Sequence, residues 1–161
     1  MRTIFRLTFS LPILTLVGIL AGCASPSAIK PGATADELTQ KLGKPTAVRP
    51  APGGGESWEY AYGPEGTQTW LFGVDQGRTV RSATQLLTEE RLRQVVAGKS
   101  TEADVRSLLG EPRDITRYRE STTWEWRVAV GPAMGMYVVH FGADGKARGY
   151  NVLNDRKEMS P

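Results

Sequence analysis

Two glutamates are the residues of this chain whose types and spacing most resemble catalytic machinery. Glu59 lies in "WEYAY" and Glu125 lies in "WEWRV", so each carboxyl stands between aromatic residues in the same order. Paired carboxylates can act as general acid and general base in glycoside hydrolysis. The alternation around them favours another interpretation, because it places both glutamates on the outer face of half-buried strands. We therefore assign neither glutamate a catalytic role.

The other candidates for catalysis or metal binding are weaker. His140 is the only histidine, so the sequence offers neither a histidine-based zinc cluster nor a second catalytic imidazole. The stretch "AGKS" (97–100) matches the end of a phosphate-binding loop, but Arg93 stands where that motif has glycine. We predict no enzymatic activity, no cofactor and no metal site.

Cys23 carries a more specific expectation. It is the only cysteine, and it closes "LAGC" after an apolar segment that two arginines precede. This layout is typical of a secretory signal, and "LAGC" resembles the lipobox of bacterial lipoproteins, where the signal is cut before a lipid-carrying cysteine. We expect a signal peptide over 1–22 and a stable anchor on Cys23, since two or more acyl chains hold a protein at a membrane. The alternative is an ordinary signal with an incidental cysteine.

Charge argues against nucleic acid as a partner. The full chain has 20 basic and 17 acidic residues and a net charge of +3. Arg2 and Arg6 lie in the predicted signal, so the rest of the chain is close to neutral. Basic residues form no stripe of the kind that binds a phosphate backbone. The expected partners are outer-membrane lipid, through acylated Cys23, and an envelope protein.

The elements that must position these residues occur twice. "TADELTQKLGKP" (34–45) returns as "TEADVRSLLGEP" (101–112), with matching Thr, acidic, apolar, Gly and Pro positions. The threonine and the acid three residues later predict a capping box at the start of a helix. The Gly-x-Pro that follows predicts the helix end, with glycine in the left-handed region. Matches at six positions indicate an internal duplication.

Strands are expected after each of these helices. "WEYAY" and "WEWRVAV" alternate, and each ends at a Gly-Pro turn before a second strand and then a third, near 79–87 and 147–153. We interpret 47–57 as a Pro/Gly-rich loop, and 113–120 as the residues of an additional strand. A further capped helix is expected over 88–98.

The sequence therefore predicts an α+β fold of two tandem units. Each unit would pack one or two short helices on a three- to four-stranded antiparallel sheet. In chain order the predicted segments are a signal peptide (1–22), a lipidated tether (23–29), a first unit (30–87), a second unit (88–155) and a tail (156–161).

A lipobox followed by this helix, Trp and three strands resembles the SmpA/OmlA (BamE-like) family of outer-membrane lipoproteins. The motif runs from Gly32 to Pro45 with Trp58, and from Gly98 to Pro112 with Trp124. The resemblance implies a non-enzymatic lipoprotein of a Gram-negative outer membrane, facing the periplasm. It also implies a protein-binding or scaffolding role in outer-membrane protein assembly or envelope integrity.

The tandem is also similar to the β-lactamase inhibitory proteins, in which two units form a curved sheet that grips a protein partner. That similarity implies an alternative function, as an inhibitor or dedicated ligand of a periplasmic or secreted enzyme.

We expect a partner to contact the rim of the second sheet. Alternation leaves Glu59 and Glu125 on a face open to water or to a partner, opposite the aromatic core face. Aromatic and arginine side chains dominate binding hot spots. The candidate partner-binding residues are Tyr118, Arg119, Arg127 and Tyr137. The alternative is that this polar face is only solvated.

The predicted lipid site can be tested by substitution. Cys23→Ser should leave the precursor uncleaved and unlipidated, because the thiol that accepts lipid is gone. Mass spectrometry and membrane fractionation would measure both effects. Normal processing and membrane retention of this variant would contradict the assignment.

Overall fold

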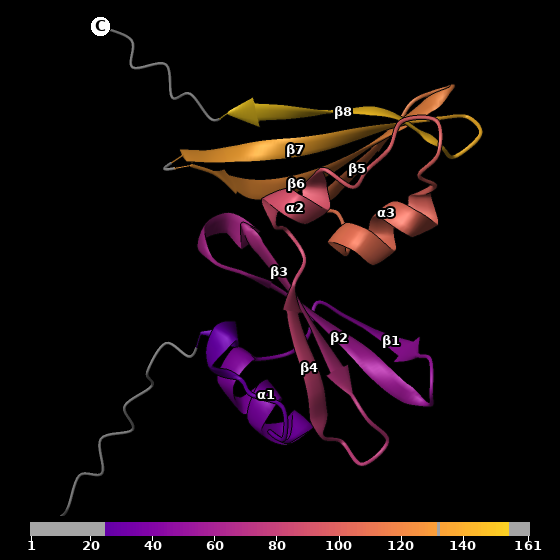
Figure 1. The fold of residues 1–161 in the computed structure, drawn as a ribbon. Helices are drawn as coiled ribbons and strands as arrows, with labels where there is room; N and C mark the ends of the chain where they lie inside the picture. The colour runs from indigo at the N-terminus through magenta and orange to yellow at the C-terminus, as the bar shows by residue number, and fades with distance from the viewer. Residues whose placement is uncertain (1–24, 132, 155–161) are drawn as a thin grey trace, which may run out of the picture.

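Two α+β units make up the computed structural model, which describes residues 25–131 and 133–154 (Figure 1). Each unit holds a four-stranded antiparallel sheet, with strand orders β1-β2-β3-β4 and β5-β6-β7-β8. The predicted fold class of two tandem units is confirmed. The predicted signal peptide, Cys23 and the tail lie outside the described residues.

The first unit packs one helix against one face of its sheet. Its elements are η1 (Pro26–Ala28), α1 (Ala35–Leu42), β1 (Ala47–Ala51), β2 (Gly55–Tyr62), η2 (Pro64–Gly66), β3 (Gln68–Val74) and β4 (Val80–Gln85). Leu38 of α1 meets Tyr60 and Phe72 of the sheet in one buried cluster. Ile29 joins this cluster and is 3% exposed, so the packed structure begins within the expected tether.

The second unit repeats this plan with larger side chains. Its elements are α2 (Glu89–Leu92), α3 (Glu102–Leu109), β5 (Asp114–Arg117), β6 (Ser121–Val130), β7 (Ala133–Gly142) and β8 (Ala147–Asn154). Trp124 and Trp126 of β6 pack with Phe141 of β7 against Val105 and Leu109 of α3. The alternation therefore predicted the core face of β6 correctly.

Local hydrogen bonds repeat in both units. Thr34 Oγ1 accepts from the Glu37 N–H at 3.1 Å and the Glu37 carboxylate accepts from the Thr34 N–H at 2.9 Å, which is the predicted capping box. Thr101 and Asp104 make the same box, at 3.2 and 2.9 Å. These bonds satisfy donors that a helix start leaves unpaired.

Each α helix of the repeat ends at a glycine with positive φ, as predicted. Gly43 has φ 80° and ψ −159°, and Gly110 has φ 82° and ψ −167°. These ψ values lie outside the left-handed helical region, in an extended region that is essentially restricted to glycine. At Gly110 a Cβ would lie 2.9 Å from Glu59 Oε1, whereas at Gly43 it would meet nothing within 4 Å. The second glycine therefore also permits a close approach between the units.

The helix predicted over 88–98 is wrong beyond its first turn, because α2 ends at Leu92. Thr88 caps it as expected, accepting from the Arg91 N–H at 3.4 Å. The later backbone groups bond elsewhere: the Val96 N–H donates to Ser100 Oγ at 2.9 Å and the Gly98 N–H donates to Ala147 O at 2.7 Å. A local bond to Ser100 and a tertiary bond to Ala147 thus replace the next helical turn.

The predicted loop over 47–57 is also wrong, since its first half is strand β1. β1 pairs with β2 and, among the described residues, has no partner strand on its other side, so it is an edge strand. An edge strand tolerates Pro50, whose missing N–H need not face a neighbouring strand. The additional strand suggested within 113–120 is present as β5.

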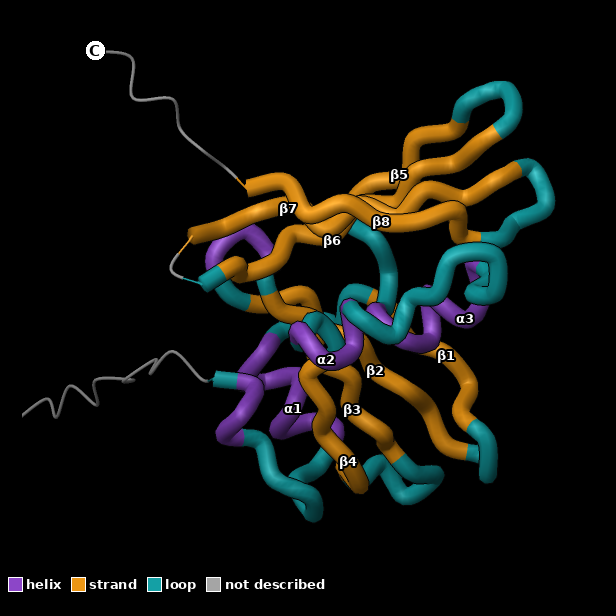
Figure 2. Tube along the Cα trace, turned by 45° about the horizontal axis from the view of Figure 1, so that its top comes forward, coloured by secondary structure: helices purple, strands orange, loops and turns teal. Residues whose placement is uncertain are grey.

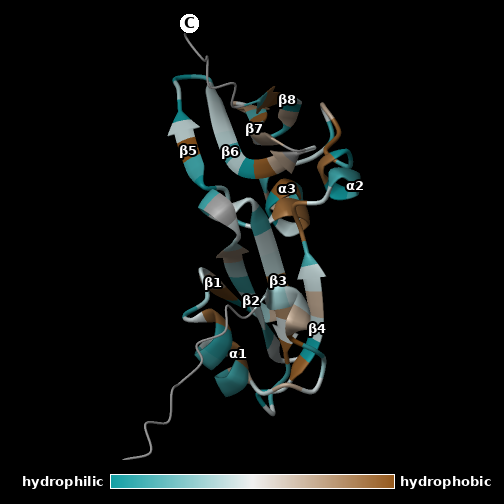
Figure 3. Ribbon diagram, turned by 90° about the vertical axis from the view of Figure 1, so that its left-hand side faces the viewer, coloured by the Kyte–Doolittle hydropathy of each residue, from teal (hydrophilic) through white to brown (hydrophobic). Residues whose placement is uncertain are grey.

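The second unit is stacked on the first through its helices. Figures 1 and 2 show α2 and α3 between the two sheets, and Figure 3 shows the units stacked end to end. The helix side of the second unit therefore faces the first sheet on the side away from α1. No helix in the described part of the chain is long and apolar enough to cross a membrane.

Candidate protein-binding site

A buried glutamate joins the two units. Glu59 in β2 is 2% exposed, and its Oε2 accepts from Arg49 Nη1 at 3.1 Å. Its Oε1 accepts from the backbone N–H of Glu111, just beyond α3, at 2.8 Å. A buried carboxylate is tolerated only when it is paired and hydrogen-bonded. Glu59 meets both requirements by using one donor from each unit.

Glu111 extends this network. Its carboxylate pairs with Arg49 of the first unit and with Arg106 of α3. Burial alone would raise the pKa of Glu111, but the hydrogen bonds and charges of the two arginines outweigh burial and lower this pKa. The Arg106 guanidinium also lies 4.5 Å from the centre of the Trp124 ring. The network therefore connects the first sheet to the core of the second unit.

A second ionic contact lies beside the first. Arg127 of β6 bonds the Glu65 carboxylate of η2, with Nη2 at 2.7 Å. Arg113 lies next to it, with Nη1 3.8 Å from the same carboxylate. The Arg127 side chain is only 11% exposed. Arg127 therefore helps to hold the two units together.

The structure corrects the predicted open face of the first sheet. Glu59 was expected to face water or a partner, but the second unit covers it. The equivalent Glu125 is half-buried. Alternation identifies the outer face of a strand correctly, but it carries no information about what another unit places on that face.

The four predicted partner-binding residues do not form one surface. Tyr118 is 63% exposed, and Arg119 is exposed beside it in the β5–β6 turn. Tyr137 is fully buried, and its hydroxyl donates to Leu92 O at 2.7 Å. Burial raises the pKa of Tyr137 well above its ordinary value. In this structure Tyr137 positions α2 and does not reach the surface, while the roles of Tyr118 and Arg119 stay predictions.

An apolar hollow lies where α2 stops short of covering the second sheet. Its volume is about 400 Å³. The residues that line it come from α2, the segment before it, the β6–β7 hairpin and β8: Leu87, Glu89, Leu92, Val128, Ala129, Gly131 and Val152. We name this cavity the α2 hollow. It is predominantly apolar, which suits an apolar side chain more than a charged ligand.

Exposed apolar side chains continue from the α2 hollow along β8. Val152 is 46% exposed and Tyr150 is 41% exposed, although both lie on the core face of the sheet opposite Tyr137 and Val139. The Tyr150 ring lies 4.9 Å from the Tyr137 ring. The core face thus extends past its covering helices, and an uncharged stretch at 149–154 was the sequence signal that could have indicated it.

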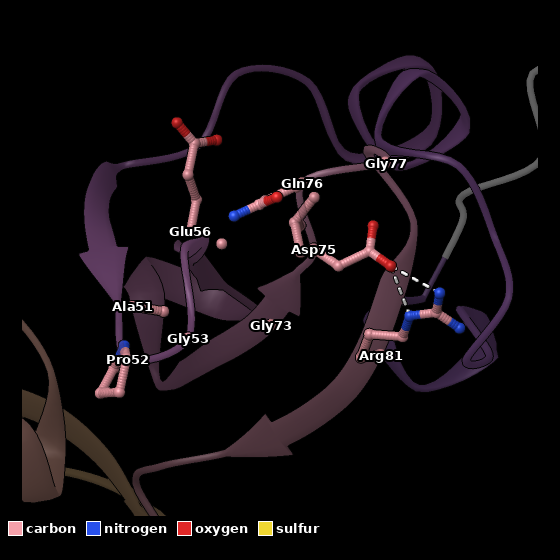
Figure 4. Close-up of a pocket in the computed structure, with 11 residues that line it drawn as sticks. Ala51, Pro52, Gly53, Glu56, Gly73, Asp75, Gln76, Gly77 and Arg81 are labelled. Atoms are coloured by element: carbon pink, nitrogen blue, oxygen red, sulfur yellow. Dashed lines mark hydrogen bonds and ion pairs between the residues drawn. The ribbon is translucent and has the colours of Figure 1, made fainter.

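A second hollow lies at the far end of the first sheet, between the β1–β2 and β3–β4 turns (Figure 4). Its volume is about 410 Å³. Asp75 pairs with Arg81 at 2.5 Å, and Glu56 accepts from Trp58 Nε1 at 2.8 Å. These charged groups already have partners within the chain, so this hollow is the weaker candidate site. The described residues also hold no cluster of His, Cys, Asp and Glu able to bind a metal ion.

No protein-family model matches this chain, and no curated protein matches it. A solved "putative beta-lactamase inhibitor protein" from Streptococcus mutans is 16% identical, with TM-score 0.37, over 84% of this chain and 89% of that chain. A DUF4309 family protein (YjgB) from Bacillus subtilis is 17% identical, with TM-score 0.31, over 76% and 79%. An extracellular protein containing an SCP domain from Bacillus anthracis is 19% identical, with TM-score 0.30, over 77% and 44%. TM-scores this low carry no argument about function.

The predicted membership of the SmpA/OmlA family is wrong. The chain matches no family model, and the solved structures that it matches belong to other families. The physical reason lies in the motif itself. Thr, acid, Gly and Pro at this spacing specify a capped helix, and any fold that needs such a helix before a strand selects the same residues.

The buried network predicts unequal effects at the two equivalent glutamates. Glu59→Gln should lower the free energy of unfolding by about 2 kcal/mol, because the hydrogen bonds from Arg49 and Glu111 lose their charged acceptor. Glu125→Gln, at the same position of the half-buried copy, should change it by less than about 0.5 kcal/mol. Urea unfolding of both variants measures the difference. Equal losses would show that burial of Glu59 does not distinguish the two units.

Proposed function

We propose that this chain is a non-enzymatic protein-binding module that is lipid-anchored through Cys23 and faces the periplasm from the outer membrane of a Gram-negative bacterium. The α2 hollow carries the protein-binding part of the proposal. It is an apolar cavity of about 400 Å³ that opens beside exposed apolar side chains of β8. Contact between this apolar surface and water is unfavourable in free energy, and a partner that covers the surface removes that contact.

The shape of this surface favours a protein over a small molecule. A cavity of this size can take a small ligand or one large side chain. The apolar surface does not end at the cavity, because Tyr150 and Val152 continue it along β8. A partner that inserts one apolar side chain and lies across β8 would cover both parts.

The anchoring part of the proposal rests on "LAGC" at 20–23. Ile29 is buried in the first unit, six positions after Cys23. Six residues span at most about 20 Å. An acylated Cys23 would therefore hold the first unit close to the membrane surface, with the second unit attached through the Glu59 network.

Affinity capture from envelope membranes tests the binding role. The full chain should capture a partner, and Leu92→Glu should reduce that capture at least tenfold, because it puts a charge on the lining of the α2 hollow; circular dichroism checks that this variant still folds. Gln76→Glu adds the same charge beside the other hollow and serves as the matched control. Quantitative mass spectrometry of the captured proteins measures the ratio.

Two outcomes of this experiment distinguish the possible functions. A single secreted enzyme, lost in Leu92→Glu and retained in Gln76→Glu, would make the chain an inhibitor or dedicated ligand of that enzyme. Capture that is equal in both variants would contradict a site at the α2 hollow. Tyr118→Ala and Arg119→Ala, measured in parallel, then test whether the β5–β6 turn binds the partner.

A further inference from the structure

β8 is the least protected sheet edge among the described residues. The two sheets end in the strands β1, β4, β5 and β8. Edge strands leave backbone N–H and C=O groups unpaired, and proteins protect them with proline, charge or short length. β1 contains Arg49 and Pro50, β4 contains Arg81, and β5 has four residues including Asp114 and Arg117. β1 and β5 therefore carry the usual protection. β4, like β8, has one arginine near its start, but it has no exposed large hydrophobic side chain.

β8 carries no such protection over 149–154. This stretch, "GYNVLN", has no charge and no proline. Tyr150, Val152 and Leu153 are 41%, 46% and 56% exposed, and they are half of the six exposed large hydrophobic side chains in the described residues. The start of the strand is already occupied, because Ala147 exchanges hydrogen bonds with Gly98 and Ser100. The unprotected edge therefore lies in the second half of β8.

We propose that this edge pairs with β8 of a second copy of the chain. The pairing would be antiparallel and two-fold symmetric, so that two second-unit sheets join into one continuous sheet. The choice of a second copy rests on the strand's self-complementarity. An uncharged strand brings no like charges opposite one another when it pairs with itself.

The register that fits best is centred on Asn151. In that register Tyr150 of each copy lies opposite Val152 of the other, which makes two cross-strand aromatic–β-branched pairs, a favourable combination. Both side chains lie on the core face, where the Tyr137 ring already contacts Tyr150 at 4.9 Å. The pairs would therefore extend an existing aromatic cluster.

The proposal goes beyond the protein-binding role. Tyr150 of the second copy would lie beside Val152, at the margin of the α2 hollow, and would leave the rest of the hollow open. A partner that lies across β8 would use the same Tyr150 and Val152 side chains, so it would compete with self-pairing, and self-pairing is therefore measured on the purified chain. The variant Leu92→Glu tests the hollow, and the variants below test the edge.

Disulfide cross-linking of the full chain tests the register. Asn151→Cys places two thiols opposite one another at the symmetry axis, where cross-strand Cβ atoms are about 4.5–5.5 Å apart, close enough for a disulfide after small adjustment. Copper-catalysed oxidation should give at least tenfold more linked dimer than two controls. One control is Thr84→Cys, on the exposed edge strand β4, and the other is the parental chain, whose only cysteine is Cys23.

Sedimentation of the detergent-solubilised full chain tests the same edge without a cross-link. Val152→Lys should weaken dimerisation at least tenfold, while Thr84→Lys should leave it unchanged. Val152 is 46% exposed, so the fold should persist, and circular dichroism checks that it does. Asn151→Cys that links no better than Thr84→Cys would overturn the proposal. A monomeric parental chain would also overturn it. If the β8 amides of that monomer then gained protection from hydrogen exchange when an extended apolar peptide was added, the edge would be assigned to a strand of another protein.

Discussion

The buried carboxylate of Glu59 is the interaction on which the arrangement of the two units depends. Its charge is removed from water, and only opposite charge and hydrogen bonds can offset that cost. Arg49 supplies the charge from the same unit, and the Glu111 N–H supplies a hydrogen bond from the other. Because that donor lies directly after α3, the carboxylate fixes where α3 sits on the first sheet. Buried ion pairs add little net stability, so the network is better understood as selecting one arrangement.

The two copies of the repeat have diverged around this contact. In the first unit the outer face of the sheet contacts the second unit. Gly110 allows this close approach because it has no Cβ, and a Cβ at that position would collide with Glu59. The second keeps Glu125 half-buried at the equivalent position. Its own distinctive feature is on the core face, where Tyr137 holds the end of a one-turn α2 and the sheet extends beyond it. The α2 hollow and the exposed side chains of β8 follow from that short helix.

Sequence reasoning succeeded where the determinants are local. The capping boxes at Thr34 and Thr101 involve residues three apart, so both helix starts could be predicted. It failed where distant residues decide: beyond α2 the Gly98 N–H bonds to Ala147 O, and the burial of Glu59 depends on Glu111, 52 residues further along the chain. The family resemblance failed for the same reason, because its motif describes a helix and its caps but not how the units pack.

Calorimetric unfolding of the chain tests the central claim most directly, since it measures whether the units behave as one body. If the Glu59 network couples them, heating should give one transition, with a calorimetric enthalpy equal to the van't Hoff enthalpy. Two resolved transitions in the unmodified chain, each with the enthalpy expected for about half of it, would contradict the claim. In that case the contact between Glu59 and Glu111 would not hold the two units together.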